Sequence, residues 1–287
     1  MTLIAQITDL HIRPSGKKAY GVVDTEAMLR AGVAAIAAQP VKPDAVIVSG
    51  DLTDCGLVEE YELLRDCLKP LAMPTYLIPG NHDRRDNLAK VFGGDGYLPT
   101  TGGYLHYTVD NFPIRLIGLD TVVPGKGNGE MDQPRLDWLK ARLDEQPDKP
   151  TLIFMHHPPF PTGLQHMDSI NCRNGEAMAA LLRHYTNVER VACGHHHRSI
   201  QIRWAGTVGS VAPSVAHQVL LDLEPHDDAR FTMEPPGYHL HLWQPGGLIT
   251  HTAYIGQFAG PYPFLLDPEY PAFGDKESAP ATHAGRH

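Results

Sequence analysis

The sequence feature that most constrains the fold is an apolar run that ends abruptly in Ser49-Gly50-Asp51. Residues 44–48 read Asp-Ala-Val-Ile-Val, which is typical of a buried strand. Gly50 lets the backbone turn sharply, because it has no side chain to block the turn. Asp51 is therefore expected at the carboxyl end of a strand, where open α/β sheets bind ligands. A carboxylate there can bridge two cations, although capping of the next helix is the more ordinary role of an isolated aspartate.

The composition narrows the class of protein. The chain has 287 residues, of which 42 % are hydrophobic and 20 % charged, as in a soluble protein of one large or two small α/β domains. The net charge of −9 argues against a nucleic-acid polymer or a membrane surface as the main partner. An anionic substrate would then need local positive charge, which bound metals supply. The 17 histidines are the compositional outlier.

Cysteine usage and hydropathy indicate the compartment. None of the four cysteines forms a C-x-x-C pair, which disfavours a thiolate zinc site. Free thiols are expected, and a Cys55–Cys67 disulfide is left open. The sequence shows no secretory leader and no long apolar run. We therefore expect a cytoplasmic protein.

Strands and helices are expected to alternate along most of the chain. Apolar runs predict buried strands at residues 3–7, 44–48, 73–78, 151–155 and 188–193. Helices are predicted at residues 26–39, 59–68, 84–92 and 136–143. This alternation implies parallel strands with right-handed crossovers. Two strands at 104–109 and 114–119 form an antiparallel hairpin that extends the core or starts a second sheet. Residues 200–252 are expected to form successive strands, including 219–223 and 238–243.

Two of the predicted strands are followed at once by polar side chains. Asp9 and His11 come after the first strand, and residues two apart in an extended segment point the same way. Three polar residues, Asn81, His82 and Asp83, come after the third strand. An ordinary polar turn before the next helix would have a similar sequence. Asn81 offers an amide oxygen to a metal, and His82 can reach a substrate. Asp83 can accept a hydrogen bond from His82 and so orient its ring.

Histidines follow the two later strands. Of the pair after residue 155, we favour His156 as the group that faces the site, and we expect His157 to hydrogen-bond behind it. Three consecutive histidines follow residue 194. His195 and His197 are expected to point one way and His196 the other. An internal run of three histidines directly after a strand is seldom an ordinary loop.

These strand ends are expected to converge, because the carboxyl ends of parallel strands lie on one edge of a sheet. All the candidate ligands are oxygen or imidazole nitrogen, which suits Zn, Mn, Fe or Co and disfavours an all-oxygen Mg or Ca cage. The candidate metal ligands are Asp9, His11, Asp51, Asn81, His156, His195 and His197.

In this order, the motifs D-x-H, G-D, G-N-H-D, H-H-P-P and G-H-x-H resemble those of the calcineurin-like metallophosphoesterases. The resemblance covers about residues 3–210, and it is greatest to the class III cyclic nucleotide phosphodiesterases and the related glycerophosphodiesterases. It implies an α/β fold, a four-layer αββα sandwich of two mixed sheets. It also implies two divalent metal ions per subunit (Fe, Mn, Zn or Co) and hydrolysis of small phosphodiesters, either 3′,5′-cyclic nucleotides such as cAMP or glycerophosphodiesters.

The resemblance also implies roles for individual residues. Asp9, His11 and His197 would bind one metal, Asn81, His156 and His195 the other, and Asp51 would bridge them. His82 and Asp83 are the catalytic candidates. Asn81, His82 and His196 are the substrate-binding candidates. Metal-activated hydroxide would attack phosphorus, with His82 protonating the leaving group.

Several alternatives stay open at this point. A phosphomonoesterase, a broad phosphoesterase or a nuclease could use the same site, and a metal-free binding scaffold could use the same fold. We expect residues 1–255 to form the catalytic domain and residues 256–287 a Pro- and aromatic-rich extension with a disordered end. The resemblance favours a homo-oligomer.

Overall fold

The computed structural model describes residues 1–99, 103–225 and 228–262. The chain divides into two compact units, Met1–Gly256 and Gln257–His287. All the helices and strands below belong to the first unit, and the disorder predicted for the chain end lies outside the described residues. Within the described ranges, no helix has both the length and the apolar character needed to cross a bilayer.

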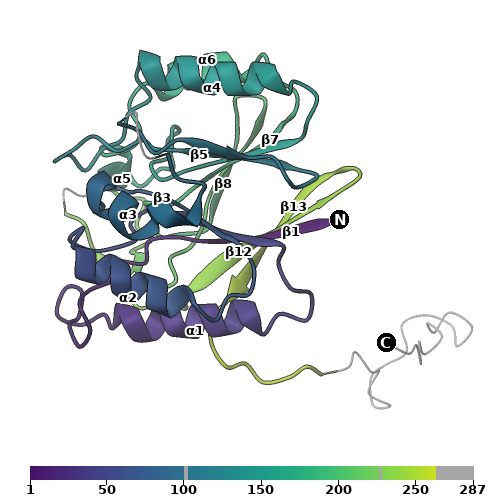
Figure 1. Ribbon diagram of the computed structural model, residues 1–287. Helices are drawn as coiled ribbons and strands as arrows, with labels where there is room; N and C mark the ends of the chain where they lie inside the picture. The colour runs from purple at the N-terminus through teal and green to yellow at the C-terminus, as the bar shows by residue number, and fades with distance from the viewer. Residues whose placement is uncertain (100–102, 226–227, 263–287) are drawn as a thin grey trace, which may run out of the picture. The chain divides into compact units, whose positions relative to one another are not determined.

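Two mixed sheets form the centre of the first unit (Figure 1). The first sheet has the order β13-β12-β1-β2-β3, in which β1, β2 and β3 are parallel and β12 and β13 antiparallel. Its strands are β1 (Thr2–Ile7), β2 (Ala45–Ser49), β3 (Thr75–Ile78), β12 (Gly237–Gln244) and β13 (Gly247–Tyr254).

The second sheet has the order β4-β5-β6-β7-β9-β8, with antiparallel strands only at its two edges. Its strands are β4 (Tyr107–Val109), β5 (Arg115–Leu119), β6 (Thr151–Met155), β7 (Val188–Cys193), β8 (Ile200–Trp204) and β9 (Thr207–Val211). A separate two-stranded ribbon pairs β10 (Gln218–Val219) with β11 (Phe231–Thr232).

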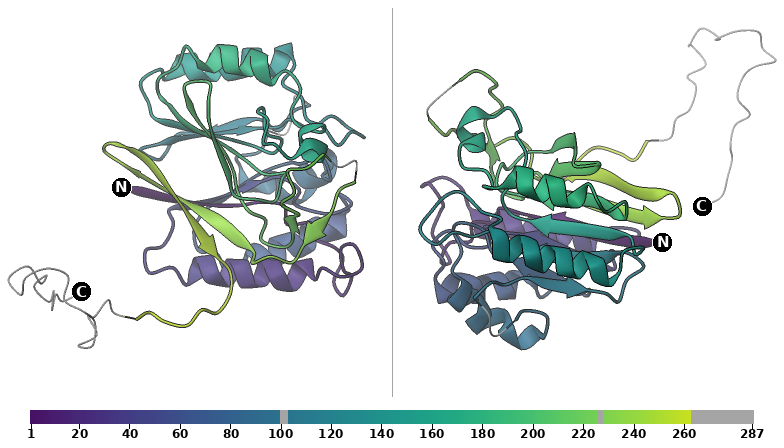
Figure 2. Two further views of the ribbon diagram at one scale, coloured as in Figure 1. Left: turned by 180° about the vertical axis from the view of Figure 1, so that it is seen from behind. Right: turned by 90° about the horizontal axis from the view of Figure 1, so that it is seen from above.

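Helices cover the outer faces of both sheets. On the side of the first sheet lie α1 (Thr25–Ala37), α2 (Val58–Leu68), α3 (Arg85–Phe92) and the short 3₁₀ helix η1 (Gly93–Asp95). On the side of the second sheet lie α4 (Gln133–Glu145) and α6 (Gly175–Leu182), and a short helix, α5 (Gln165–Asp168), lies in the β6–α6 connection. Figure 2 shows the same order of layers from behind. The predicted four-layer αββα sandwich is confirmed.

Burial on both faces explains why the central strands read as unbroken apolar runs. In β6, Ile153 and Met155 belong to the core beneath α4 and α6. The intervening Leu152 and Phe154 belong to the core that reaches the first sheet. Alternate residues of a strand point to opposite faces, so a strand between a helix layer and a second sheet must be apolar at every position.

The structure corrects two expectations, adds a helix and settles the place of the hairpin. The strands whose ends carry the candidate ligands do not share one sheet: β1, β2 and β3 lie in the first and β6 and β7 in the second. The strand predicted at 219–223 is confined to β10. Helix α6 was not predicted; it begins without a capping side chain, after Asn174 with a φ of 62°. The 104–119 hairpin belongs to the second sheet.

A buried glutamine ties the two sheets together. The Gln6 amide nitrogen donates to Ser49 Oγ at 2.8 Å and to the Cys193 carbonyl at 3.0 Å. Its amide oxygen pairs with His241 Nε2 at 3.0 Å. All four residues are buried, so water cannot replace these bonds. Gln6 therefore links β1 to β2, β7 and β12, next to the loops that carry the candidate ligands.

We predict that Gln6→Leu destabilises the fold, because it leaves buried polar partners of Gln6 without hydrogen bonds. The free energy of unfolding should fall by about 3 kcal/mol, since each unsatisfied buried group costs about 1–3 kcal/mol. Denaturant titration measures the loss. Gln201→Leu, at an exposed position of β8, is the matched control and should change stability by no more than about 0.5 kcal/mol. Equal effects of the two substitutions would contradict this account.

Candidate metal centre

The candidate ligands share an unusual backbone conformation. The backbone angle φ lies between 46° and 71° at five of them, Asp9, His11, Asp51, His195 and His197. This left-handed region is rarely adopted by residues other than glycine. Each instance costs about 1–3 kcal/mol, and such strain gathers at functional sites. The turns after β1, β2 and β7 are therefore held in conformations that aim these side chains at one place.

Backbone hydrogen bonds join the turns to one another. Leu10 N and His11 N both donate to the Asp51 carbonyl, at 2.8 and 2.9 Å, which fixes the β1 turn on the β2 turn. Across the sheets, His195 N donates to both Asp9 carboxylate oxygens at 3.0 Å. A side chain at Gly80 would lie 2.2 Å from Asp51 Oδ1, so only glycine lets the β3 turn approach this closely.

Two buried carboxylates lie at the centre. Burial raises the pKa of Asp9 to about 6, and the nearby Asp51 carboxylate adds to this effect. Burial also opposes the charge of Asp51, but His156, His82 and His11 outweigh it and hold the pKa of Asp51 well below its usual range. Two buried carboxylates side by side require positive charge nearby, because an uncompensated buried charge is very costly.

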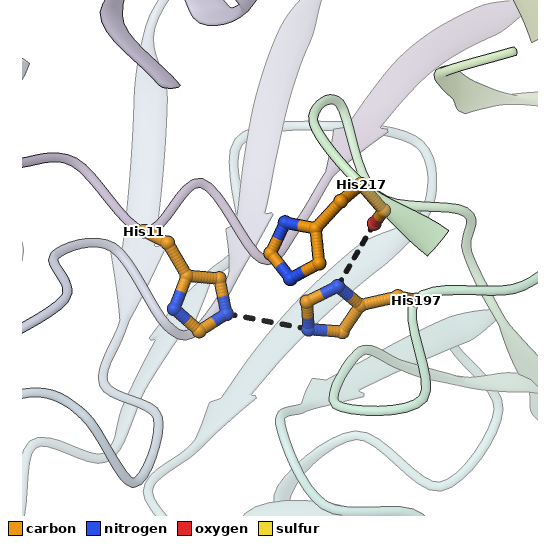
Figure 3. Close-up of side chains that lie close together, drawn as sticks. All are labelled: His11, His197 and His217. Atoms are coloured by element: carbon orange, nitrogen blue, oxygen red, sulfur yellow. Dashed lines mark hydrogen bonds between the residues drawn. The ribbon is translucent and has the colours of Figure 1, made fainter. Parts of the chain in front are cut away.

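Two candidate ion positions lie beside these carboxylates, and we call each position with its donor atoms a corner. His11 and His197 supply the nitrogen atoms of the first corner (Figure 3). Their Nε2 atoms are 3.2 Å apart. His197 Nδ1 donates to the His217 carbonyl at 3.0 Å, and His11 Nδ1 lies 3.3 Å from Asp54 Oδ1. In the neutral tautomers set by these partners, both Nε2 atoms present lone pairs to the same point. Two nitrogens on one tetrahedral zinc ion, each at about 2.1 Å, lie about 3.4 Å apart.

Carboxylate oxygens complete this corner. Asp9 Oδ1 is 3.3 Å from His197 Nε2, and Asp51 Oδ2 is 3.6 Å from His11 Nε2. Four acceptor atoms thus face one position, and a cation there would satisfy all of them. The donor set of Asp9, His11, Asp51 and His197 fits a divalent ion of the Zn, Mn, Fe or Co type.

A second corner lies on the other side of Asp51. His156 Nδ1 lies 2.8 Å from the Ser49 carbonyl, which leaves the Nε2 lone pair directed inward. That Nε2 is 3.3 Å from Asp51 Oδ2 and 3.1 Å from Asn81 Oδ1. Among the described residues, the buried Nε2 of His195 has no hydrogen-bond partner. The donor set of Asp51, Asn81, His156 and His195 therefore also fits a divalent ion, and Asp51 is common to both corners.

Without bound metal, protons on two of the histidines supply the positive charge that the carboxylates need. Burial opposes the charge of His156, but Asp51 and Asp9 outweigh it and raise the pKa of His156 to about 9. Burial opposes the charge of His11 as well, and the hydrogen bond to Asp54 nevertheless raises its pKa. Burial and neighbouring histidines hold the pKa values of His195 and His197 well below the usual range. Neutral imidazole is the form that binds metal.

The structure places two of the predicted residues differently from the sequence analysis. Asp83 does not orient the His82 ring: its carboxylate accepts from Leu52 N, Thr53 N and Gly80 N, and from the hydroxyls of Thr53 and Tyr61. The His82 ring is oriented by the Asp54 carbonyl, 2.8 Å from Nδ1. Asp83 instead holds the β2 and β3 turns together.

His196 is the other correction. Its Nδ1 lies 3.0 Å from Thr162 Oγ1 and its Nε2 2.7 Å from Asn171 Oδ1. Both ring nitrogens are therefore engaged inside the protein, where His196 is fully buried. His196 anchors the loop before α6 rather than facing a substrate. His157, predicted to lie behind the site, lies 2.7 Å from Thr121 Oγ1 through Nδ1.

His217 lies beside the candidate ligands, although the sequence did not predict it. It lies in the loop before β10, and its ring is 4.5 Å from the His197 ring and 5.4 Å from the His11 ring, between centroids (Figure 3). Burial and the nearby histidines lower the pKa of His217 to about 2. A single histidine in a loop has no sequence pattern around it that indicates a site. His217 is recognised only in the tertiary structure, which brings its loop next to His197.

A hollow of about 340 Å³ opens above the two corners. One wall is apolar or aromatic, and the floor carries the candidate ligands. Its lining is His11, Tyr20, Asp51, Asn81, His82, His166, Met167, Ile170, His195, His197, His217, Val219, Ala229, Arg230 and Phe231. A small molecule can therefore reach both corners and His82 from solvent.

Comparison with known proteins shows to which protein family this chain belongs. The model of the calcineurin-like phosphoesterase family matches residues 2–199. The chain belongs to the calcineurin-like phosphoesterase family. A probable glycerophosphodiester phosphodiesterase GpdQ of Arcobacter nitrofigilis is 44 % identical over 264 residues, which is 91 % of this chain and 96 % of the relative. The 3′,5′-cyclic adenosine monophosphate phosphodiesterase CpdA of Escherichia coli K12 is 28 % identical over 250 residues, 86 % of this chain and 87 % of the relative.

A solved structure shows the same fold. A dimetal phosphatase from Danio rerio matches with a TM-score of 0.63 at 17 % identity, over 89 % of this chain and 99 % of that one. At this identity the likeness concerns the fold alone. The calcineurin-like fold predicted from the sequence is confirmed.

We predict that metal binding strengthens as the pH rises. A bound ion must displace the proton of Asp9, with its pKa of about 6, and that of His156, with its pKa of about 9. Both protons are present in the metal-free protein below the lower value, and that of His156 is still present between the two. His11, whose pKa is also raised, releases a further proton when it binds metal. The logarithm of the Mn²⁺ affinity should therefore rise by at least two per pH unit below the lower pKa and by at least one between the two values.

Calorimetric titration of the metal-free protein with Mn²⁺ in a series of buffers measures this dependence. The proton release in each buffer reports the number of displaced protons directly. A His156→Asn variant keeps a neutral ligand and should lower the slope between the two values by about one. An affinity independent of pH over this range would contradict the assignment.

Proposed function

We propose that this calcineurin-like protein is a dinuclear-metal phosphodiesterase that hydrolyses small phosphodiesters. The observation that carries the proposal is the pair of inward-facing donor sets that share the buried Asp51 carboxylate and open into one hollow. We infer that Asp9, His11 and His197 hold one ion, Asn81, His156 and His195 hold the other, and Asp51 holds both.

Glycerophosphodiesters are our first candidate substrates. The Arcobacter relative, which is 44 % identical to this chain, is described as a probable glycerophosphodiester phosphodiesterase. Cyclic nucleotides are the second candidate, because CpdA of Escherichia coli is described as acting on cyclic AMP. The net charge of −9 favours these small diesters over a nucleic-acid polymer.

Divalent ions bound in these sets would lower the pKa of water and neutralise charge on the phosphoryl oxygens. The chain itself orients the reactants. Backbone bonds from His195 N to Asp9 and from His82 N to Asp51 hold both carboxylates in place. The buried position of these groups strengthens their electrostatic effect on a bound phosphodiester.

His82 is placed to act as a general acid. The Asp54 carbonyl accepts a hydrogen bond from Nδ1, which fixes the ring and directs Nε2 away from that partner. His82 is half-buried and lines the hollow, so its Nε2 proton can be passed to a leaving alkoxide. A proton delivered there avoids the release of an unstabilised alkoxide, an effect typically worth about 10²–10⁴ in rate.

Finer features remain proposals. The two ions are of the Fe, Mn, Zn or Co type, and residues 1–255 form the catalytic domain with 256–287 as an extension. We keep the homo-oligomeric state and the cytoplasmic location as predictions, which sedimentation and cell fractionation would test. All four cysteines are free in the structure, as predicted.

A hydrolysis panel tests the function. Metal-free protein is reloaded with Mn, Co, Zn or Fe and assayed on glycerophosphocholine, glycerophosphoethanolamine, cyclic AMP, cyclic GMP and the p-nitrophenyl mono- and diesters of phosphate. Metal-dependent hydrolysis of at least one diester, faster than that of the monoester, is expected. Faster monoester hydrolysis would favour the phosphomonoesterase alternative, and metal binding without any turnover would favour a binding scaffold.

We predict that the effect of His82→Ala depends on the leaving group. Hydrolysis of a glycerophosphodiester should slow by about 10²-fold, because an alkoxide needs a proton donor. Hydrolysis of bis(p-nitrophenyl) phosphate should slow far less, because p-nitrophenolate is a stable anion. Steady-state kinetics of both substrates, with metal content measured in parallel, provide the test. His251→Ala, at an exposed position of β13, is the control, and equal losses on both substrates would rule out the proton-donor role.

A further inference from the structure

A second hollow adjoins the candidate metal centre. It has a volume of about 640 Å³ and shares Asn81 and His82 with the hollow above the metal centre. The β2 turn, the β3 turn and the loop after β5 form its walls. Its lining is Asp54, Cys55, Asn81, His82, Asp83, Arg84, Arg85, Asp86, Val122, Pro124 and Gly125. The two hollows thus lie on either side of His82.

Most charged groups of this second hollow are already compensated. Arg85 pairs with Asp120 at 2.5 and 2.8 Å and also donates to the Val122 carbonyl. Asp54 lies 3.3 Å from both Arg13 and His11. Asp83 is buried among its five donors. None of these groups is free to bind a ligand.

Arg84 differs from its neighbours. Among the residues that the structure describes, its guanidinium has neither an ion-pair partner nor a hydrogen-bond acceptor, whereas the adjacent Arg85 is fully paired. The aliphatic part of the Arg84 side chain packs against the Gly56 backbone, because a Cβ atom at Gly56 would lie only 2.6 Å from Arg84 Cγ. The exposed guanidinium therefore extends from a packed aliphatic stem without a described partner, and Arg84 directly follows Asp83, which ties down the turn.

Asp86 supplies the complementary charge. It lies in the first turn of α3, where its carboxylate accepts from Asn87 N at 2.9 Å. It is not ion-paired with Arg84 or with any other described cation. Among the described residues, the second hollow thus presents one unpaired positive and one unpaired negative side chain, both exposed, in a lining that also includes His82.

A phosphodiester has two ester arms, and the site has two hollows that meet at Asn81 and His82. We propose that one arm of the substrate enters the second hollow and carries a zwitterionic, amino-acid-like head group, whose carboxylate binds Arg84. Asp86 is placed to meet the ammonium group of the same head group. This inference rests on the proposed phosphodiesterase function and names the substrate class within it.

Two diesters isolate the contribution of Arg84. Glycerophosphoserine and glycerophosphoethanolamine differ only by one carboxylate, so the ratio of their kcat/KM values reports recognition of that group. In Arg84→Gln this ratio should fall by about fivefold, the effect of a charge pair of about 1 kcal/mol at a partly exposed site. Arg84→Glu should lower the ratio further, and Arg84→Lys should restore much of it because it keeps the positive charge.

A matched control and a binding measurement complete the test. Lys90→Gln removes one exposed positive charge from the far end of the same helix and should leave the ratio unchanged. Calorimetry with O-phosphoserine and O-phosphoethanolamine, on the metal-loaded wild type and Arg84→Gln, should show the same fivefold change in relative affinity.

The outcomes separate this inference from the proposed function. If the wild type hydrolyses no diester of the panel above, the proposed function fails, and the calorimetric ratio still decides whether Arg84 binds a carboxylate. If it hydrolyses a cyclic nucleotide but neither glycerophosphodiester, the function stands and the head-group inference is overturned. If both diesters are hydrolysed but Arg84→Gln and Lys90→Gln give the wild-type ratio, the role of Arg84 is overturned while the function stands. An equal loss on both diesters in Arg84→Gln would also overturn it.

Discussion

A buried carboxylate between imidazoles of two sheets is the constraint on which this structure depends. Asp51 Oδ2 lies within 3.6 Å of His11 Nε2 and 3.3 Å of His156 Nε2. A carboxylate removed from water needs compensating charge on every side. The β1, β3 and β6 turns all supply groups to the Asp51 carboxylate, through a backbone N–H donor or through rings. The sandwich thus brings distant segments together around one acidic group. The inward-facing lone pairs of these carboxylate and imidazole groups fit cations.

The sandwich and the site depend on each other. Left-handed turns at the strand ends are unfavourable in isolation, and hydrogen bonds across the two sheets hold them in place. His195 N binds Asp9, and His156 Nδ1 binds the Ser49 carbonyl. Gln6 adds a third link just below them. A single sheet could present such groups along one edge, but two facing sheets surround the candidate ion positions and leave His82 in the lining of the hollow.

Local patterns predicted much of the fold. The predicted bounds of β6 and β7 agree with the structure, because strands buried on both faces read as unbroken apolar runs between polar residues. The division into two sheets followed only from the family resemblance, since strand pairing is not a local property. Most site candidates ended strands and so could be found. His217 could not, because it comes from a loop that is brought to the site only by tertiary structure, and the partners of Asp83 were hidden for the same reason.

Anomalous X-ray diffraction from crystals loaded with Mn²⁺ or Zn²⁺ tests the central claim most directly. The account predicts two anomalous peaks about 3.5–4 Å apart. One should be bound by Asp9, His11 and His197, the other by Asn81, His156 and His195, with an Asp51 oxygen at each. A single peak remote from Asp51, or two peaks that Asp51 does not join, would contradict it.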